Sequence, residues 1–193
     1  MTKRRSKIFW LDVETTGTDH KIHDIWQLAY LIEIDGVVRE EGKMLIRPDN
    51  FDTIDERALE VGGTTIEELE KIDYNIADAV ADLKNVWGKY VDKYDRADKF
   101  VVAGYFIHFD IKFLRKLFSR VGDRYGIGSY CFTALLHVDT FVGIAVGKFG
   151  FRFENHKLET VCKKLKIPLK KAHDSLEDIK ATKKLYEMLG ELS

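Results

Sequence analysis

The stretch "FWLDVETTG", Phe9 to Gly17, places two carboxylates at the end of an apolar run. Residues 8–13 are mostly apolar, which predicts a short buried strand. Asp12 and Glu14 are two residues apart, so their side chains point to the same face of that strand. Like charges side by side on one face repel each other. The pair therefore predicts that a cation lies between Asp12 and Glu14.

The composition is that of a globular protein. The chain has 193 residues, of which 45% are hydrophobic and 33% are charged. These values predict one domain over residues 1–193 with its own core, preceded by a basic tail, residues 1–7, that could be flexible. The formal net charge of -1 does not indicate a nucleic-acid binder. An enzyme that grips only a chain end needs few phosphate contacts, so neutrality does not exclude one.

Targeting and redox signals are weak. No apolar core follows the basic start, and no apolar run approaches the roughly 20 residues of a membrane span. Cys131 and Cys162 are the two cysteines, which favours buried thiols over a disulfide framework or a zinc site. We therefore expect a cytoplasmic protein with no membrane partner.

Periodicity along the chain predicts strand hairpins first and alternating strands and helices afterwards. The predicted strands are residues 8–13, 25–34, 37–46, 100–105 and 135–140. The predicted helices cover residues 54–60, 64–71, 76–90, 110–121, 156–167 and 175–189. Asp35 and Gly36 form a turn signal that joins the second and third strands as an antiparallel hairpin. This order predicts an α/β protein with a mixed sheet flanked by helices.

Asp110 lies where a core-facing stripe begins. Asp110, Leu114, Leu117 and Val121 are spaced i, i+4, i+7 and i+11, which is one side of a helix. The spacing places Asp110 at the inward edge of the first turn, where an unpaired carboxylate is unfavourable. The alternative is that Asp110 caps the helix.

The last helix repeats this pattern. Asp178 begins a stripe that continues through Ala181 or Thr182, Leu185 and Leu189.

His173 precedes that helix. Asp174 and Glu177 form a capping-box pattern, which starts the helix near Ser175 and leaves His173 in the preceding loop. Its side chain can then reach the same site as that of Asp178.

Each of these residues has an ordinary structural explanation when taken alone. A strand acid is often a surface charge, an aspartate at a helix start is often a cap, and a single histidine is often a surface or core residue. Together, four acids and one histidine indicate a site. Carboxylate oxygens are hard ligands that suit magnesium or manganese.

Three segments together resemble a known family. "DVETTG", "GYFIHFDIKFL" and "HDSLEDIKAT" are similar to the three motifs of the DnaQ-like, DEDD-type exonucleases with a catalytic histidine, which include the proofreading exonucleases of DNA polymerases. The resemblance extends over residues 8–189. It includes "IDERALEVGGTTIEEL", which is similar to the family's segment between its third strand and first long helix.

The resemblance implies a ribonuclease H-like fold with a mixed five-stranded sheet. It implies hydrolysis from 3′ ends with release of nucleoside 5′-monophosphates. It also implies that two ions, Mg²⁺ or Mn²⁺, are held by Asp12, Glu14, Asp110 and Asp178. By the same resemblance, His173 is the general base.

Two positions depart from the family pattern. The second motif commonly has asparagine where this chain has Phe106, and the third often has alanine where it has Ser175. Phe106 could stack on a base or pack in the core. Thr15 and His108 are further candidates for substrate contact.

Two other clusters have competing interpretations. Residues 19–24, "DHKIHD", could bind a metal or form a loop beside the site. A group of lysines could follow backbone phosphates or form a solvated helix face: Lys157, Lys163, Lys164, Lys166, Lys170 and Lys171.

The leading hypothesis is thus a metal-dependent 3′–5′ exonuclease that acts on single-stranded DNA ends. The alternatives are a 3′–5′ exoribonuclease of the same superfamily and a non-catalytic nucleic-acid-binding subunit. A DNA polymerase or a repair or replication complex is a candidate partner. The sequence ends just past the last predicted helix, which favours a free-standing enzyme or a small complex.

Overall fold

The protein is built on a five-stranded mixed sheet, which confirms the fold class that the resemblance implied. The computed structural model describes residues 5–123, 125–169 and 174–191. The strands are β1 (Lys7–Thr15), β2 (Ile25–Ile34), β3 (Val37–Leu45), β4 (Phe100–Gly104) and β5 (Cys131–His137). Their order in the sheet is β3-β2-β1-β4-β5. β1 pairs antiparallel with β2 and parallel with β4. β3 is antiparallel to β2, and β5 is parallel to β4.

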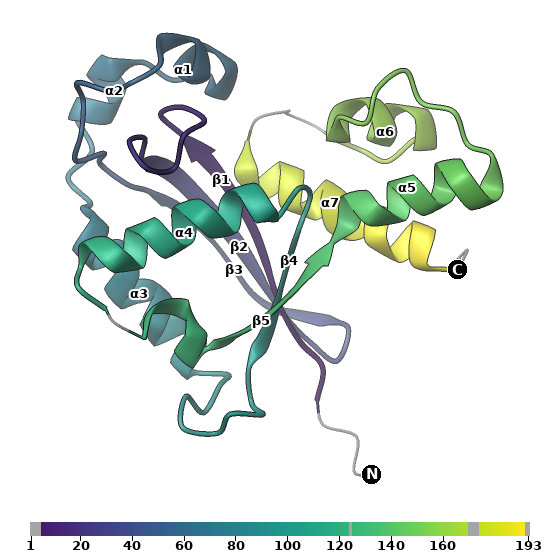
Figure 1. Ribbon diagram of the computed structural model, residues 1–193, viewed down its shortest axis with the longest axis horizontal. Coiled ribbons are helices and arrows are strands. Elements are labelled where there is room, and N and C mark those ends of the chain that lie inside the picture. The colour runs from purple at the N-terminus through teal and green to yellow at the C-terminus, as the bar shows by residue number, and fades with distance from the viewer. Residues whose placement is uncertain (1–4, 124, 170–173, 192–193) are drawn as a thin grey trace.

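Helices cover both faces of the sheet (Figure 1). They are α1 (Glu56–Gly62), α2 (Ile66–Glu70), α3 (Ile76–Gly88), α4 (His108–Arg120), α5 (Val138–Phe149), α6 (Leu158–Leu165) and α7 (Ser175–Gly190). A 3-10 turn, Gly126–Ser129, lies between α4 and β5. Within the described residues, none of these helices is both long enough and apolar enough to cross a membrane.

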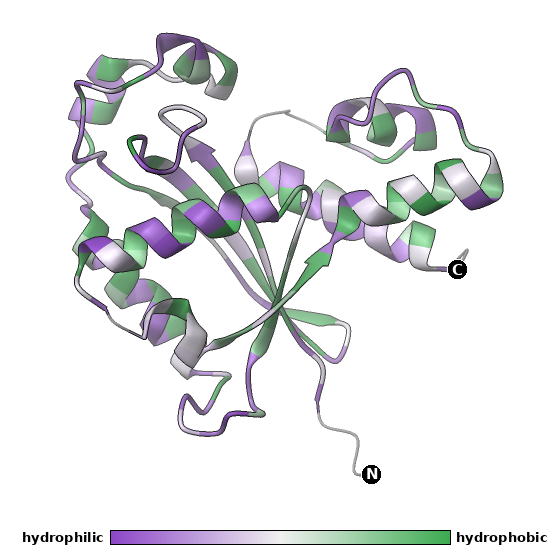
Figure 2. Ribbon diagram, in the orientation of Figure 1, coloured by the Kyte–Doolittle hydropathy of each residue, from purple (hydrophilic) through white to green (hydrophobic). Residues whose placement is uncertain are grey.

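Alternation along β1 divides the core into two halves. Phe9, Leu11 and Val13 belong to the cluster that includes α3 and α4. Trp10 belongs to the cluster on the other face, with α5, α6 and α7. Figure 2 shows hydrophobic and hydrophilic residues mixed along α4 and α7, as expected for helices that pack one side on a sheet. The same alternation places Asp12 on the face of α7.

Side-chain caps mark the starts of α1, α2, α3 and α7. Asn75 caps α3 by accepting a hydrogen bond from the backbone N–H of Asp78. Thr65 and Glu68 form a full capping box at α2. In each cap a side-chain oxygen satisfies a backbone N–H that the helix leaves free.

Three expectations were wrong in detail. The fifth strand is Cys131–His137 rather than 135–140, and the chain then forms the helix α5, which the sequence did not predict. Val121, expected in the buried stripe, is exposed because α4 ends at Arg120. Lys7, expected in the basic tail, belongs to β1 and its Nζ forms an ion pair with Asp98. Residues 1–4 of the tail lie outside the described residues.

Candidate active site

Two carboxylates extend from the end of β1 toward α7. Asp12 and Glu14 follow Trp10 on one face of the strand, and both are half-buried. A register irregularity between Glu14 and Thr15 ends the regular pairing with β2. The two acids therefore stand where the central strand leaves the sheet.

Helix α7 supplies the third carboxylate. Asp178 lies in its first turn. One ligand oxygen from each of Asp12, Glu14 and Asp178 can be chosen so that all three lie within 4.8 Å of one another. The structure thus brings together three of the four acids that the sequence singled out. Oxygens at such separations can bind one cation in common.

Asp110 completes the group from α4, although it is not a helix cap. Ile107 occupies the N-cap position, and Asp110 lies in the first turn with its side chain buried. Its Oδ1 accepts a hydrogen bond from the backbone N–H of Val13 at 3.1 Å. β4 pairs with β1 only as far as Trp10, so Asp110 satisfies an N–H that β4 leaves free.

The four acids line one open cavity. Its volume is about 490 Å³. The remaining lining residues are Val13, Tyr105, Phe106, His108 and Phe109. In the described part of the chain, the lining contains neither lysine nor arginine to offset the carboxylates.

The crowded carboxylates perturb one another. Burial, and then the neighbouring Asp178 and Asp110, raise the pKa of Glu14 to about 8. Burial raises the pKa of Asp110 to about 7, although its backbone hydrogen bonds oppose the shift. Burial and the surrounding acids raise the pKa of Asp12 well above its usual value. The charged state of this group is therefore unfavourable without a compensating cation.

The donor set fits a divalent cation. The ligand atoms are hard carboxylate oxygens, which magnesium, manganese and calcium prefer. A cation among Asp12, Glu14 and Asp178 would offset the repulsion that, together with burial, raises the pKa values of Asp12 and Glu14. This arrangement gives a physical reason for two acids on one face of β1.

Buried polar contacts fix the start of α7. Gln27 on β2 accepts hydrogen bonds from the backbone N–H and the hydroxyl of Ser175. Asp174 caps the helix and pairs with Lys43 of β3 at 2.7 Å. β2 and β3 therefore both hold the turn from which Asp178 projects.

Phe106 lies at the edge of the cavity and not in the core. Its side chain is 41% exposed, and its φ of +52° is unusual for a residue other than glycine. Its backbone N–H donates to Oδ1 of Asp139 at 3.2 Å. The Phe106 ring meets the Tyr105 ring edge-on at 4.8 Å between centroids. The interpretation of Phe106 as a core residue is wrong.

The two weaker substrate candidates differ in their surroundings. His108 is exposed and lines the cavity. Thr15 is buried, and its hydroxyl donates to the backbone oxygen of Gly17 at 2.7 Å. Thr15 therefore has a structural bond that stabilises the chain where β1 ends.

The histidine-rich loop is explained without a metal. The backbone N–H of Asp19 donates to Nδ1 of His23, which closes the loop on itself. Asp24 is buried and binds Lys116 and Arg120 of α4. The loop interpretation of residues 19–24 thus accounts for these contacts.

Three residues that the sequence singled out lie outside the described residues. They are His173, the expected base, and Lys170 and Lys171 of the lysine group. Four further members of the lysine group are described and exposed: Lys157, Lys163, Lys164 and Lys166.

Sequence reasoning missed three polar residues that support the site. Gln27 and Lys43 hold α7, and Asp139 holds the backbone of Phe106. Gln27 had a usable signal, since it is the polar residue in an otherwise apolar run, "IWQLAYL". Lys43 and Asp139 had none, because their partners are distant in the sequence.

Solved structures share this fold. Exonuclease I from E. coli, in a zinc-bound complex with single-stranded DNA, matches with a TM-score of 0.77 and 21% identity over 98% of this chain. Exonuclease I from Methylocaldum szegediense matches with a TM-score of 0.74 and 18% identity over 96% of this chain. This chain spans 43% and 40% of those two chains, respectively. At these identities the likeness concerns the fold.

Sequence comparison adds a relative and a family. A PolC-type DNA polymerase III from Thermotoga petrophila is 24% identical over 176 residues, which is 91% of this chain and 11% of that protein. The exonuclease family model RNase_T matches residues 9–186. That match covers all four acids of the cavity, and the chain belongs to the RNase_T exonuclease family.

Proposed function

We propose that this protein is a metal-dependent 3′–5′ exonuclease that acts on single-stranded DNA and releases nucleoside 5′-monophosphates. The observation that carries the proposal is the meeting of Asp12, Glu14 and Asp178, with ligand oxygens within 4.8 Å of one another. A group of this kind, in a chain of an exonuclease family, suits phosphodiester hydrolysis.

Two divalent ions, Mg²⁺ or Mn²⁺, are the cofactors we propose. Asp12 lies among Glu14, Asp110 and Asp178, all of which act on its pKa, so it is placed to serve both ions. Bound divalent cations polarise the phosphate, lower the pKa of water and stabilise the leaving oxygen. Asp110 remains oriented by its bond to the Val13 N–H.

The cavity supports recognition of one terminal nucleotide. Its volume of about 490 Å³ lies in the usual range for a small-molecule site. The exposed ring of Phe106 offers a stacking surface for the terminal base, and His108 stands beside it within reach of substrate.

His173 is proposed as the group that takes a proton from the attacking water. The support is its motif position, five residues before Asp178. A positioned base of this kind commonly accelerates a reaction by about 10²–10⁴-fold.

The setting of the enzyme is also proposed. We treat residues 1–193 as one exonuclease domain, because all described strands belong to one sheet. Cys131 and Cys162 are free and buried, which suits a reducing compartment such as the cytoplasm. A DNA polymerase or repair complex is a candidate partner, given the PolC-type relative.

Digestion of matched oligonucleotides tests the function. A 5′-labelled DNA strand should shorten stepwise in Mg²⁺ or Mn²⁺, and a chelator should stop the reaction. A ladder produced by loss of 5′ nucleotides would contradict the polarity. Faster digestion of RNA of the same sequence would favour the exoribonuclease. Binding without cleavage under every metal condition would favour the non-catalytic subunit.

A further inference from the structure

One side of α4 carries exposed polar residues that begin at the cavity. His108, Lys112, Arg115 and Ser119 are all exposed and spaced i, i+4, i+7 and i+11, so they form a single row. His108 is a cavity residue. The row therefore leads away from the candidate active site along the helix.

The two cations in this row are free to meet a ligand. Within the residues that the structure describes, neither Lys112 nor Arg115 is engaged in an ion pair or hydrogen bond. In contrast, Lys116 and Arg120 on the neighbouring side of α4 both bind the buried Asp24. Stabilisation of the fold thus explains the second pair and leaves the first pair without a structural role.

The row ends in a groove with aromatic walls. The groove has a volume of about 420 Å³ and is lined by Arg115 and Ser119 of α4 and by Tyr125 and Phe132. Tyr125 is 83% exposed and Phe132 is 37% exposed. Cations beside exposed aromatic rings are the usual elements of a surface for single-stranded nucleic acid, because phosphates meet the cations and bases stack on the rings.

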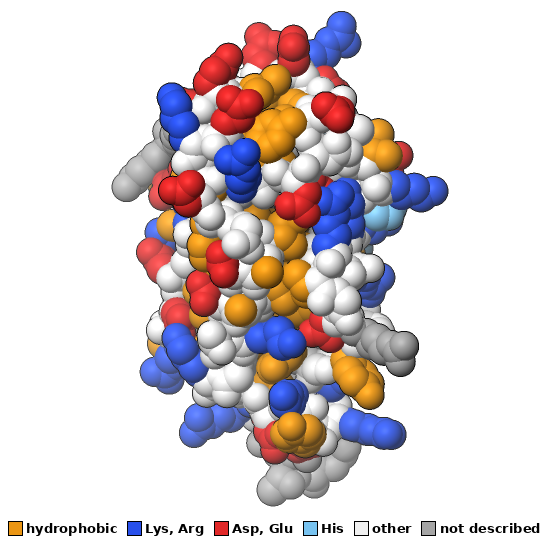
Figure 3. Space-filling view, turned by 90° about the vertical axis from the view of Figure 1, so that its left-hand side faces the viewer, with side chains coloured by type: hydrophobic (Ala, Val, Ile, Leu, Met, Phe, Trp, Pro, Cys, Tyr) orange, Lys and Arg blue, Asp and Glu red, His pale blue; other side chains and the backbone are white. Residues whose placement is uncertain are grey.

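Local charges favour an anionic strand on this side. Asp123 is the acid in the groove, and Lys84 neutralises it at 2.8 Å. The other border of the cavity is different, since Gly62 at the end of α1 lies against Glu14. Exposed acids gather on α1 and α2: Glu56, Glu60, Glu67, Glu68 and Glu70. Figure 3 shows red side chains at the upper end of the molecule, where Figure 1 places these helices.

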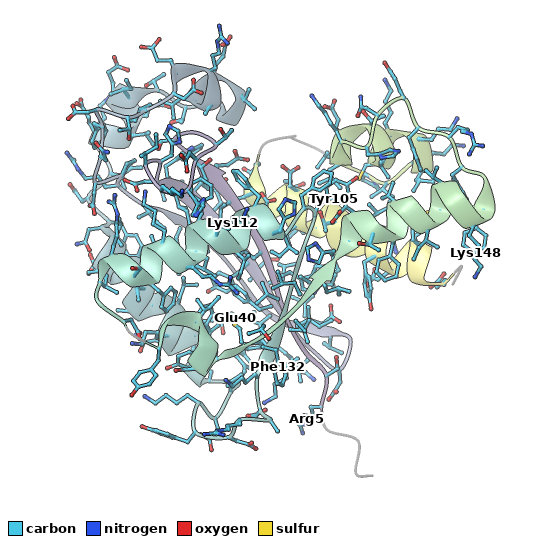
Figure 4. All side chains as sticks on the ribbon, in the orientation of Figure 1. Arg5, Glu40, Tyr105, Lys112, Phe132 and Lys148 are labelled. Atoms are coloured by element: carbon cyan, nitrogen blue, oxygen red, sulfur yellow. The ribbon has the colours of Figure 1, made fainter. Side chains whose placement is uncertain are left out.

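We propose that the row on α4 and the aromatic groove bind the part of a single strand that lies upstream of its 3′ nucleotide. Lys112 and Arg115 contact phosphates, and Tyr125 and Phe132 stack on bases. This inference rests on the proposed function, because it takes the 3′ end to lie among the four acids. Figure 4 labels Lys112 on α4 and Phe132 on β5.

The row on α4 and the aromatic groove together form a path for the strand, and the length of this path sets how many nucleotides it holds. From His108 to Ser119 the helix rises about 16 Å, at 1.5 Å per residue. At about 3.4 Å per nucleotide of a stacked strand, this distance corresponds to roughly five nucleotides. Affinity should therefore increase as a strand is lengthened to about this size.

Strand binding tests the path without cleavage. A 5′-fluorescein-labelled fifteen-nucleotide oligothymidylate is titrated in chelator and followed by fluorescence anisotropy. In the double variant Lys112→Gln/Arg115→Gln we expect about tenfold weaker binding. For single strands, each lost phosphate contact lowers the slope of log K against log salt by about 0.7, so the double variant should lose about 1.4. Tyr125→Ala should weaken binding by about tenfold with little change in that slope.

Matched controls separate the path from general charge and exposure. Arg39→Gln/Lys148→Gln removes the same two kinds of charge. Arg39 lies on the hairpin strand β3, and Lys148, labelled in Figure 4, lies near the far end of α5. Tyr94→Ala removes a tyrosine that is 84% exposed in the loop before β4. Both controls should bind the strand like the parent protein.

Cleavage then distinguishes this inference from the proposed function. The path variants should lose kcat/KM on the fifteen-nucleotide strand but retain it on the nitrophenyl ester of thymidine 5′-monophosphate, which has no upstream phosphates. A parent protein that hydrolyses neither substrate contradicts the proposed function, while the anisotropy result still judges the path.

Two results would overturn the inference. The first is parent-like affinity and salt slope in Lys112→Gln/Arg115→Gln and in Tyr125→Ala. The second is weakened binding in Lys163→Gln/Lys164→Gln on α6 in place of the α4 variant. The strand would then leave the cavity across the opposite face of the sheet.

Discussion

Oε1 of Gln27 accepts two hydrogen bonds from Ser175, at 3.1 Å from the backbone N–H and at 2.7 Å from the hydroxyl. Gln27 is also the residue that pairs with Glu14 across β1 and β2. A single buried side chain thus joins the strand neighbour of one carboxylate to the helix that carries Asp178. It also accounts for serine at a position where the family often has alanine.

Substitution of Gln27 should destabilise the protein more than substitution of Ser175. Ser175→Ala leaves the backbone N–H bonded to Gln27 and should lower the free energy of unfolding by about 1 kcal/mol. Gln27→Leu leaves two buried donors without an acceptor, and each costs about 1–3 kcal/mol. Urea unfolding measures both, with the exposed Ser119→Ala as a control that should change little. Equal losses in the two variants would show that the contact is not organised this way.

The grouping of the four acids was largely predictable from the sequence because strand and helix periodicities determine the direction in which side chains point. Two residues of separation placed Asp12 and Glu14 on one face of β1, and the stripe through Leu185 placed Asp178 on the inner side of α7. For Asp110 the sequence could not separate a cap from an inward ligand, since both begin a helix. The deciding fact, a free Val13 N–H, depends on where β4 stops.

Helix α5 was missed because its local propensities favour a strand. Valine, threonine, isoleucine and two glycines are weak helix formers, and they follow the apolar run "ALLH" without a break. Burial of Val138, Val142 and Ala145, at i, i+4 and i+7, accompanies the helix, which packs against α7. Tertiary packing therefore overrides local preference here.

The stability of the metal-free protein should fall as the pH rises. In the folded protein the pKa of Glu14 is about 8 and that of Asp110 is about 7. In the unfolded chain both carboxyls have a pKa of about 4. Between these values the folded state binds more protons, so stability is full below about pH 4 and is lost as the pH rises through about 7 to 8. Thermal melts in chelator measure this dependence.

Divalent ions and a matched variant provide the controls for that dependence. Mg²⁺ should raise the melting temperature more at pH 8 than at pH 5, because ions and protons compete for the same oxygens. Glu14→Gln removes one titrating group and should flatten the profile. A melting temperature in chelator that rises from pH 5 to pH 8, with Glu14→Gln unchanged, would contradict the raised pKa values.

Phe106 should limit stability while it supports binding. Its φ of +52° is unfavourable for a bulky residue, whereas asparagine adopts such values readily, and asparagine is the residue that the family commonly has there. Phe106→Asn should therefore raise the free energy of unfolding by about 1 kcal/mol and raise KM, since the stacking ring is lost. Phe106→Leu is the matched variant, because it loses the ring but keeps the strain. Equal stability of the two variants would exclude strain, and an unchanged KM in both would exclude stacking.

Substitution of Asp12 should affect metal binding, whereas substitution of His173 should affect proton transfer. Asp12 is surrounded by Glu14, Asp110 and Asp178, which disfavour its charge in the absence of ions. Asp12→Ala should therefore stabilise the protein in chelator, while it removes both metal binding and activity. His173→Ala should retain most metal affinity and slow single-turnover cleavage by about 10²–10⁴-fold, because only the proton acceptor is lost. Calorimetric titration with Mn²⁺ beside rapid-quench cleavage measures the two effects. Parent-like cleavage by His173→Ala would remove it from the mechanism, and loss of metal binding as complete as in Asp12→Ala would make it a ligand.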